Sequence, residues 1–195
     1  MLFRSDCELM PGDIVDQNSF IEILGVSKTP IREAINTLET EGLVTILPRR
    51  GVLVSSISLD DVQHIYEARE VLEPIVAELA AKRADKEVLK SYKESFQTEQ
   101  SDAGTIKMDV SFHQYIASAT GNPYLIKVMD MLTIQNTRIT VLGAKVPERL
   151  EESNKEHIRI IDAMLERDGE AAKQTMTDHI ASARAVAMKV GTVLM

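Results

Sequence analysis

The chain has 195 residues, 44% hydrophobic and 27% charged, a composition that suits a soluble globular protein and excludes fibrous and disordered classes. Its formal net charge of −8 argues against broad, nonspecific binding to nucleic acid or anionic membranes, but it leaves room for a small local basic surface. With one cysteine (Cys7), no apolar run near the ~18 residues of a membrane span and no signal-peptide core, the sequence predicts a cytoplasmic protein without disulfides or a membrane partner.

Residues 1–57 contain short elements in an order typical of a winged helix-turn-helix. Residues 17–24 are predicted to form a short helix that ends in a turn. Ser27 is expected to cap a second helix, because a serine hydroxyl satisfies the free backbone N–H groups of a first turn, and Gly42 is expected to stop it. The buried face of this second helix is predicted from helical spacing to comprise Ile31, Ala34, Ile35 and Leu38.

A β-hairpin is expected directly after the second helix. Its sequence, LVTILPRRGVLVSSI, contains two short apolar runs that meet at Pro48-Arg49-Arg50-Gly51. Short runs rich in β-branched residues on either side of a turn sequence are typical of paired strands. We therefore expect residues 1–57 to be a DNA-binding domain made of two helices and a wing.

Residues 58–195 are nearly all helical in pattern, beginning with Ser58 as a helix cap. Six helices separated by short connections predict an antiparallel bundle, so the fold class is mainly α with a small winged domain in front. After the first helix, the others are expected over 86–100, 105–119, 124–142, from Pro147 onward, and after the break at Asp168-Gly169.

The start of the second predicted helix carries side chains suited to DNA. A helix that enters the major groove by its N-terminus presents backbone N–H groups to phosphate, and an arginine there reaches guanine. The alternative is that these residues are ordinary surface charges, since residues 1–57 carry five basic and eight acidic side chains. Within residues 24–51, however, there are four basic side chains and three acidic ones. The candidates are Ser27, Lys28, Thr29 and Arg32, with Arg49 and Arg50 at the hairpin tip.

A resemblance strengthens the DNA-binding interpretation. The succession VSKTPIREAI, LETEGLV and PRRGVLV resembles the amino-terminal domain of GntR-family bacterial transcription regulators. The resemblance implies operator binding through the residues above and through Gly51 of the wing. Asn18 departs from the basic residue common in the family, and the first helix before Pro11 is shortened, which raises the expectation that the native N-terminus lies upstream of Met1.

The bundle contains a possible metal site. Asp109 and His113 are four residues apart and share one helix face, while His157 and His179 lie in the middle of two later helices. Three imidazoles and one carboxylate converging from three helices would bind a divalent transition metal such as Zn, Ni or Mn. The alternative is that each histidine is an ordinary surface or core residue, which is how we interpret His64.

A second resemblance covers the bundle. The stretches DVSFHQYIASATGNPYL, NKEHIRIIDAML and EAREVLEP are similar to the FCD effector domain of the FadR subfamily in its VanR-like form. The resemblance implies that Asp109, His113, His157 and His179 bind a metal and that a small organic acid binds beside it. Arg69 matches the arginine of the opening motif, and Arg138 is a second candidate for the acid. Arg69 could instead pair with Glu73, and Arg138 could simply be exposed.

The leading hypothesis is a metabolite-responsive transcription factor, of repressor type, that binds a palindromic DNA operator as a homodimer and is not an enzyme. An organic acid bound at the metal would shift the bundle helices and act on the DNA-binding domain through residues 55–59. Two alternatives remain. One is a metal-dependent hydrolase, for which the sequence offers no obvious general base among neighbours such as Glu156 and Asp178. The other is a purely structural metal.

Overall fold

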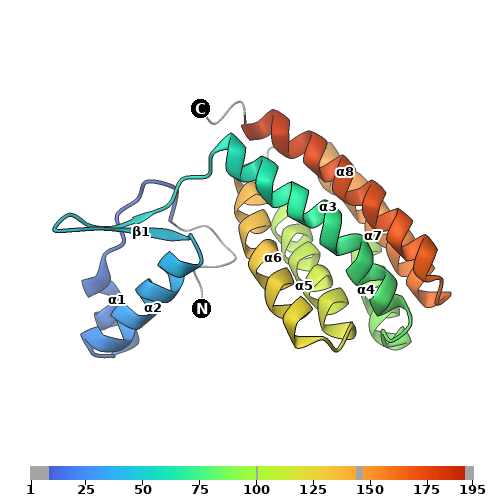
Figure 1. Ribbon diagram of the computed structural model, residues 1–195, viewed down its shortest axis with the longest axis horizontal. Coiled ribbons are helices and arrows are strands. Elements are labelled where there is room, and N and C mark those ends of the chain that lie inside the picture. The colour runs from blue at the N-terminus through green and yellow to red at the C-terminus, as the bar shows by residue number, and fades with distance from the viewer. Residues whose placement is uncertain (1–8, 100, 144–146, 192–195) are drawn as a thin grey trace. The chain divides into compact units, whose positions relative to one another are not determined.

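The computed structural model describes residues 9–99, 101–143 and 147–191, and Cys7 and the start of the chain lie outside these ranges. The chain divides into two compact units, Met1–Ile57 and Ser58–Met195 (Figure 1). The described residues form eight helices and one two-stranded sheet, so the mainly helical class predicted from the sequence is confirmed. None of the described helices combines the length and the apolar character that a membrane span requires.

The first unit begins with a helix-turn-helix. Helix α1 (Gln17–Leu24) ends at Gly25, whose φ of 63° lies in the left-handed region that glycine adopts without strain. Helix α2 (Lys28–Thr40) follows after a short turn. Ser27 occupies the N-cap position as predicted, but its exposed side chain makes no capping hydrogen bond. The first N–H groups of α2 are therefore not capped by this hydroxyl.

The wing is an antiparallel hairpin of β1 (Val44–Leu47) and β2 (Gly51–Val54). Its turn places Arg49 at a φ of 64°, an uncommon conformation for a residue other than glycine. On its other edge, β2 is bridged by Ile14 from the segment before α1. Both edges of β2 are thereby hydrogen-bonded, which fixes the base of the wing.

The core of the first unit differs from the prediction at one position. Ile31 and Ile35 of α2 are buried against Val44 and Val52, and Leu38 packs at their border. Ala34 was expected on the same face, but it is exposed. The burial on α2 is confined to the stripe that faces the short sheet, and this stripe is narrower than the full apolar arc of the helix.

The second unit begins with the long helix α3 (Leu59–Ala81). Ser58 and Asp61 form a capping box, in which the Ser58 hydroxyl accepts a hydrogen bond from the Asp61 backbone N–H and the Asp61 carboxylate accepts one from the Ser58 backbone N–H. Pro74 lies inside α3 and is buried. Because proline has no N–H, it leaves one hydrogen bond of the helix unmade.

Five further helices complete the bundle. Helix α3 packs against α5, α6, α7 and α8, while α4 packs against α5 and α7 (Figure 1). The bundle interior therefore receives side chains from all six helices. The remaining helices are α4 (Lys86–Thr98), α5 (Asp102–Ala119), α6 (Pro123–Gly143), α7 (Pro147–Leu165) and α8 (Gly169–Gly191).

The bundle core combines apolar packing with an unusual set of buried polar side chains. Its fully buried apolar members include Phe112, Ile116, Ile160, Ile161, Met164, Met176 and Ile180. Ionisable side chains are rarely buried unless they are paired. Among the described residues, six arginine, glutamate and histidine side chains are buried, each with less than a tenth of its surface exposed: Arg69, Glu73, His113, Glu156, His157 and His179.

Candidate functional site

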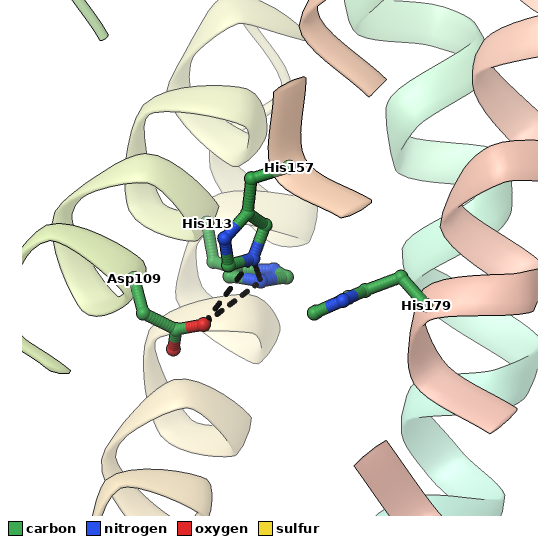
Figure 2. Close-up of side chains that lie close together, drawn as sticks. All are labelled: Asp109, His113, His157 and His179. Carbon is green, nitrogen blue, oxygen red and sulfur yellow. Dashed lines mark hydrogen bonds and ion pairs between the residues drawn. The ribbon is translucent and has the colours of Figure 1, made fainter. Parts of the chain in front are cut away.

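The four residues predicted to bind a metal lie together inside the bundle. Asp109 and His113 come from α5, His157 from α7 and His179 from α8 (Figure 2). One ligand atom from each residue can be chosen so that all four atoms lie within 4.8 Å of one another. The three histidines are buried, and Asp109 is partly buried. The helical spacing of Asp109 and His113 places both side chains on the inner face of α5.

The distances between these atoms approach those of a metal coordination shell. The Nε2 atoms of His113 and His157 are 3.3 Å apart, and Asp109 Oδ1 lies 3.3 Å from His157 Nε2. The Asp109 carboxylate is 3.8 Å from His113 Nε2. Ligands about 2.1 Å from a tetrahedral ion are roughly 3.4 Å from each other. A small closure of the widest pair would bring all four groups to a shared cation.

Two carboxylates behind the histidines orient the imidazole rings. Glu73 Oε2 lies 2.6 Å from His113 Nδ1, and Glu156 Oε2 lies 2.7 Å from His179 Nδ1. A ring whose Nδ1–H donates to a carboxylate directs the lone pair of Nε2 to its other side. The His179 ring, which shares a hydrogen bond with Glu156, therefore presents Nε2 toward the centre. The Nε2 of His113 faces the same centre, where it lies 3.3 Å from His157 Nε2. Metal-binding histidines are typically held by such outer carboxylates.

Electrostatics keep these two carboxylates ionised. Burial opposes ionisation, but the Arg69 charge and then the His113 charge hold the pKa of Glu73 well below its usual range. Burial likewise opposes ionisation of Glu156, while His179 and Arg149 lower its pKa to about 2. Burial and the neighbouring His157 lower the pKa of His179 to about 3, so this ring is neutral at pH 7. A neutral imidazole is the form that coordinates a metal.

The other members of the cluster respond to the same charges. Burial would raise the pKa of Asp109, but a hydrogen bond from His157 and the charges of the histidines hold it well below its usual range. Burial lowers the pKa of His157. Burial also lowers that of His113, but Glu73 reverses the effect and raises it. Asp109 is thus an ionised carboxylate facing three imidazoles, the donor set expected for a divalent transition metal.

Arg69 lies at the edge of the cluster and pairs with Glu73 in the bundle core. The pairing with Glu73, which was the alternative to effector binding by Arg69, is therefore present. The guanidinium carbon also lies 5.0 Å from the centre of the Tyr66 ring. Its Nη1 is buried and has no hydrogen-bond partner among the described residues. One end of the guanidinium is thus paired with Glu73, and the other end has no hydrogen-bond partner among the described residues.

Arg138 is placed differently from Arg69. It is partly buried, and its Nη1 donates to Gln135 Oε1 over 2.8 Å. Its charge contributes to lowering the pKa of Asp61 in the first turn of α3, after the larger effects of Ser58 hydrogen bonds. Asp61 precedes Arg69 by eight residues, about 12 Å along a helix. Arg138 is therefore associated with the beginning of α3, whereas Arg69 is associated with the cluster.

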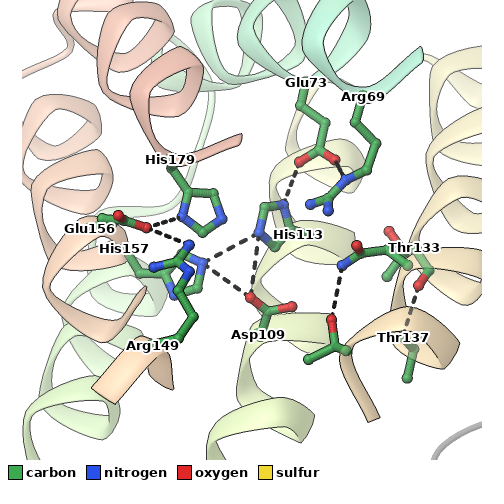
Figure 3. A network of polar contacts seen from close by, with 12 residues as sticks. Arg69, Glu73, Asp109, His113, Thr133, Thr137, Arg149, Glu156, His157 and His179 are labelled. Carbon is green, nitrogen blue, oxygen red and sulfur yellow. Dashed lines mark hydrogen bonds and ion pairs between the residues drawn. The ribbon is translucent and has the colours of Figure 1, made fainter. Parts of the chain in front are cut away.

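Arg149 lies at the site but was not among the residues predicted from the sequence. Arg149 on α7 donates from Nη2 to Glu156 over 2.8 Å, and its Nη1 is buried without a partner among the described residues (Figure 3). Arg149 and Glu156 are seven residues apart, two turns of one helix, and this spacing is the signal that could have revealed them. Glu156 was set aside because it adjoins His157 in sequence. Its partner in the structure is His179, on another helix.

Tyr66 is a further residue near the cluster that was not predicted as part of the site. Its ring is buried on α3, and no hydrogen bond joins its hydroxyl to another described residue. Burial raises its pKa, which the nearby Arg69 partly offsets. The hydroxyl is therefore protonated and is an additional polar group close to Asp109 and the two arginines.

The residues predicted to contact DNA are all exposed on the first unit. Ser27, Lys28 and Thr29 lie at the beginning of α2, and Arg32 lies one turn later. Arg49 and Arg50 lie in the turn of the wing, and Gly51 begins β2 directly after it. None of the four basic side chains in this set pairs with an acidic side chain among the described residues, so their charges face solvent. Free backbone N–H groups and unpaired cations at the start of α2 suit phosphate.

Comparisons with known proteins give the same division of the chain. Residues 5–54 match the family described as "Bacterial regulatory proteins, gntR family", and residues 64–182 match the family described as "FCD domain". Among curated relatives, the HTH-type transcriptional repressor GlaR of Escherichia coli is 30% identical over 174 residues, covering 80% of this chain and 77% of GlaR. The families and the relatives are transcriptional regulators rather than enzymes, and none of these matches favours the hydrolase alternative.

Solved structures share the fold. E. coli McbR/YncC superposes with a TM-score of 0.84 at 20% identity, over 96% of this chain and 92% of that protein. The Zn²⁺-bound FCD domain of TM0439 superposes with a TM-score of 0.57 at 21% identity, over 69% of this chain and 96% of that domain. Because the sequence identities are only 20% and 21%, these two superpositions establish the fold of the chain and nothing about its ligands.

The buried pair of Arg69 and Glu73 leads to a prediction about stability. In protein kept metal-free with EDTA, Glu73→Gln should lower the free energy of unfolding by about 3–5 kcal/mol, because it leaves a buried guanidinium without its counter-charge. Urea denaturation followed by circular dichroism measures this change. Since the pKa of Glu73 is held low, the difference should be present in full above the ordinary glutamate pKa and should shrink steadily as the pH falls below that value toward the lowered pKa of the folded state.

Glu70→Gln is the matched control for this variant. The Glu70 carboxylate pairs with Arg184 over 2.6 Å at a partly exposed position. Exposed pairs typically contribute about 0–1 kcal/mol, so the control should unfold nearly as the wild type does. Equal effects of the two substitutions would contradict the role given to Glu73.

Proposed function

Because this chain belongs to the GntR family of bacterial transcriptional regulators and carries an FCD domain, we propose that a small organic acid, bound at a metal in its bundle, controls its affinity for an operator. The protein is a DNA-binding transcriptional regulator. The proposal adds the metal, the acid and the way in which they act on DNA binding. The observation that carries it is the convergence of Asp109 and three histidines, two of them held by outer carboxylates.

The proposed metal ligands are Asp109, His113, His157 and His179. Their donor set of three imidazoles and one carboxylate suits Zn, Ni or Mn. The solved FCD domain of TM0439 that binds Zn²⁺ supports this assignment by similarity of fold. A bound divalent cation would act as a Lewis acid that accepts a carboxylate oxygen of the effector. Glu73 and Glu156 are positioning residues, because each fixes the ring of one ligand.

Charge balance favours a carboxylate as the effector. Asp109, Glu73 and Glu156 contribute three negative charges, and Arg69 and Arg149 contribute two positive ones, which leaves one negative charge when the histidines are neutral. A divalent cation changes this sum to one positive charge. One carboxylate then makes the interior neutral, as a low-dielectric core requires. The free Nη1 groups of Arg69 and Arg149 would donate hydrogen bonds to it.

The proposed DNA contacts lie on the first unit. Lys28 and the N-terminus of α2 would contact phosphate, Arg32 would read a guanine in the major groove, and the wing would contact the adjacent backbone or minor groove. Ser27, Thr29, Arg49, Arg50 and Gly51 complete the proposed set. By analogy with the repressor GlaR, we assign a repressor role, in which binding of the acid changes operator affinity.

A homodimer is proposed because a palindromic operator requires two recognition helices about one helical turn apart. The bundle offers a surface for it. On α3, the exposed apolar residues Val71, Ile75 and Leu79 recur every four positions. Helix α6 packs beside α3 (Figure 1). It exposes Tyr124, Val128 and Met131 at similar spacing. Two adjacent apolar stripes of this kind are typical of a helical interface between subunits.

The effect of the acid would reach the DNA-binding unit through residues 55–59, which connect the last strand to α3. Ligands drawn together around the metal would shift α5, α7 and α8 relative to α3. A coupling of about 1–3 kcal/mol would change operator affinity roughly 5–150-fold. This magnitude is sufficient for a transcriptional response.

Arg32→Ala should weaken operator binding by about 5–150-fold, because a bidentate contact with guanine contributes about 1–3 kcal/mol of discrimination. Fluorescence anisotropy with a palindromic operator selected from random DNA measures the affinity. Arg159→Ala removes an exposed arginine from the bundle and should leave DNA binding unchanged. If the Arg32 variant and the wild type bind the operator equally well, the assignment of the recognition helix is wrong.

His157→Ala should lower the affinity for Zn²⁺ by more than about tenfold, because it removes one of four ligands. Competition with a chromophoric chelator measures this affinity, and His64→Ala, which changes an exposed histidine, is the control. Removing the metal from the wild-type protein with EDTA tests whether the metal takes part in sensing or is purely structural. If EDTA lowers the melting temperature but short-chain carboxylates bind as before, the metal only stabilises the bundle.

Ile75→Glu should shift the protein from dimer to monomer in sedimentation velocity, because it introduces a charge into the proposed α3 and α6 interface. Ile75 is 42% exposed. Val88→Glu on α4, where the valine is 38% exposed, gives an equal charge at an equally exposed apolar position outside the interface. A dimer that persists in the Ile75 variant and dissociates in the Val88 variant would place the interface on α4.

A further inference from the structure

A row of polar side chains lies on the inner face of α6, beside the proposed metal centre. Residues 133, 136, 137 and 140 follow helical spacing, so they share one face of the helix. Helix α6 packs against α5 and α3, which carry Asp109 and Arg69. Figure 3 shows Thr133 and Thr137 near Arg69 and Asp109, with hydrogen bonds of their own within α6. The row consists of Thr133, Asn136, Thr137 and Thr140.

Asn136 is the member of this row whose hydrogen-bonding capacity is not used. It is 6% exposed, and its Nδ2 reaches Thr140 Oγ1 only at 3.5 Å. Its Oδ1 is buried and has no partner among the described residues. Thr137, by contrast, donates its hydroxyl to the carbonyl of Thr133 over 2.7 Å. If the amide of Asn136 is turned over, the unpaired atom is a donor instead of an acceptor, so one polar atom lacks a partner in either orientation.

An unpaired amide in a bundle core destabilises the protein, since alanine or leucine at this position would fill the space without burying polar atoms. A second unpaired polar group comes from α3, where Arg69 Nη1 is buried and has no partner among the described residues. Open polar groups thus converge from α3 and α6. Such a set is typical of a site that is completed by a polar ligand.

We infer that the effector is a small hydroxylated carboxylate, and that Asn136 pairs with its hydroxyl group while the carboxylate binds at the metal and Arg69. This inference rests on the proposed function and specifies the chemical class of its ligand. A hydroxyl both donates and accepts, so it satisfies Asn136 in either orientation of the amide. Once the carboxylate has neutralised the site, a second charged group would again leave a net charge in the core. The second polar group of the effector is therefore uncharged.

The experiment compares pairs of acids that differ by one hydroxyl. Full-length, Zn²⁺-loaded protein is titrated by calorimetry with acetate and glycolate, propionate and 2-hydroxypropionate, and butyrate and 3-hydroxybutyrate. In at least one pair, the hydroxylated acid should bind the wild type about tenfold or more tightly, because an otherwise unpaired buried amide gains a partner. Asn136→Ala should reduce the affinity for that acid by about the same factor and leave the affinity for its partner acid within about twofold.

Three controls make the result specific. Gln97→Ala removes an exposed amide from α4 and should behave as the wild type. A 2-hydroxy acid can also chelate a metal through its hydroxyl, so a preference that Asn136→Ala leaves intact would show recognition by the metal and overturn the role of Asn136. If Asn136→Ala is poorly folded, as judged by its melting temperature, Asn136→Ser keeps a small polar group and should give an intermediate preference.

The outcomes also distinguish this inference from the proposed function. If both acids of every pair bind equally tightly, the hydroxylated class is wrong while control by a carboxylate stands. If none of the six acids binds the Zn²⁺-loaded protein, both the inference and the proposed carboxylate site are overturned.

Discussion

Ionised carboxylates inside a helical bundle are stable only when opposite charges face them, and this constraint organises the second unit of the molecule. Two arrangements of the same kind meet it. Glu73 lies between Arg69 and His113, and Glu156 lies between Arg149 and His179. In each, one carboxylate joins an arginine to a candidate ligand imidazole, and each arginine keeps one buried Nη1 without a partner among the described residues. An anion held by either arginine would therefore act, through one carboxylate, on the orientation of a ring at the centre.

The sequence was sufficient where the signals are local. The spacing of Asp109 and His113 placed both on one face, and turn residues such as Gly25 and Gly42 marked the ends of helices that the structure contains. Partners on different helices could not be read in this way. The contact of Glu156 with His179 joins residues 23 positions apart, and only packing of α7 against α8 creates it. Ala34 was predicted to be buried for a related reason. Helical periodicity shows which residues share a face, but it does not show how much of that face the sheet covers.

The two units differ in where their functionally important charges lie. In the winged unit, cationic side chains such as Lys28 and Arg32 are exposed and make no ion pairs with described residues, so their charges act on solvent and on polyanions. Inside the bundle, the buried carboxylates are paired with arginines, Glu73 with Arg69 and Glu156 with Arg149. A protein with a net charge of −8 can still present a local cationic surface, because the acidic residues lie largely outside it. The net charge of a chain therefore says little about the surface that meets DNA.

Pro74 makes α3, the helix that contains Arg69 and Glu73, easier to bend. It follows Glu73 directly, and the backbone of α3 lacks one stabilising bond at that turn. The bending stiffness of a helix is lowest where such a bond is missing. Segments of α3 on the two sides of this turn can therefore tilt independently at small energetic cost. The compliant point of the longest core helix coincides with the carboxylate that links Arg69 to His113.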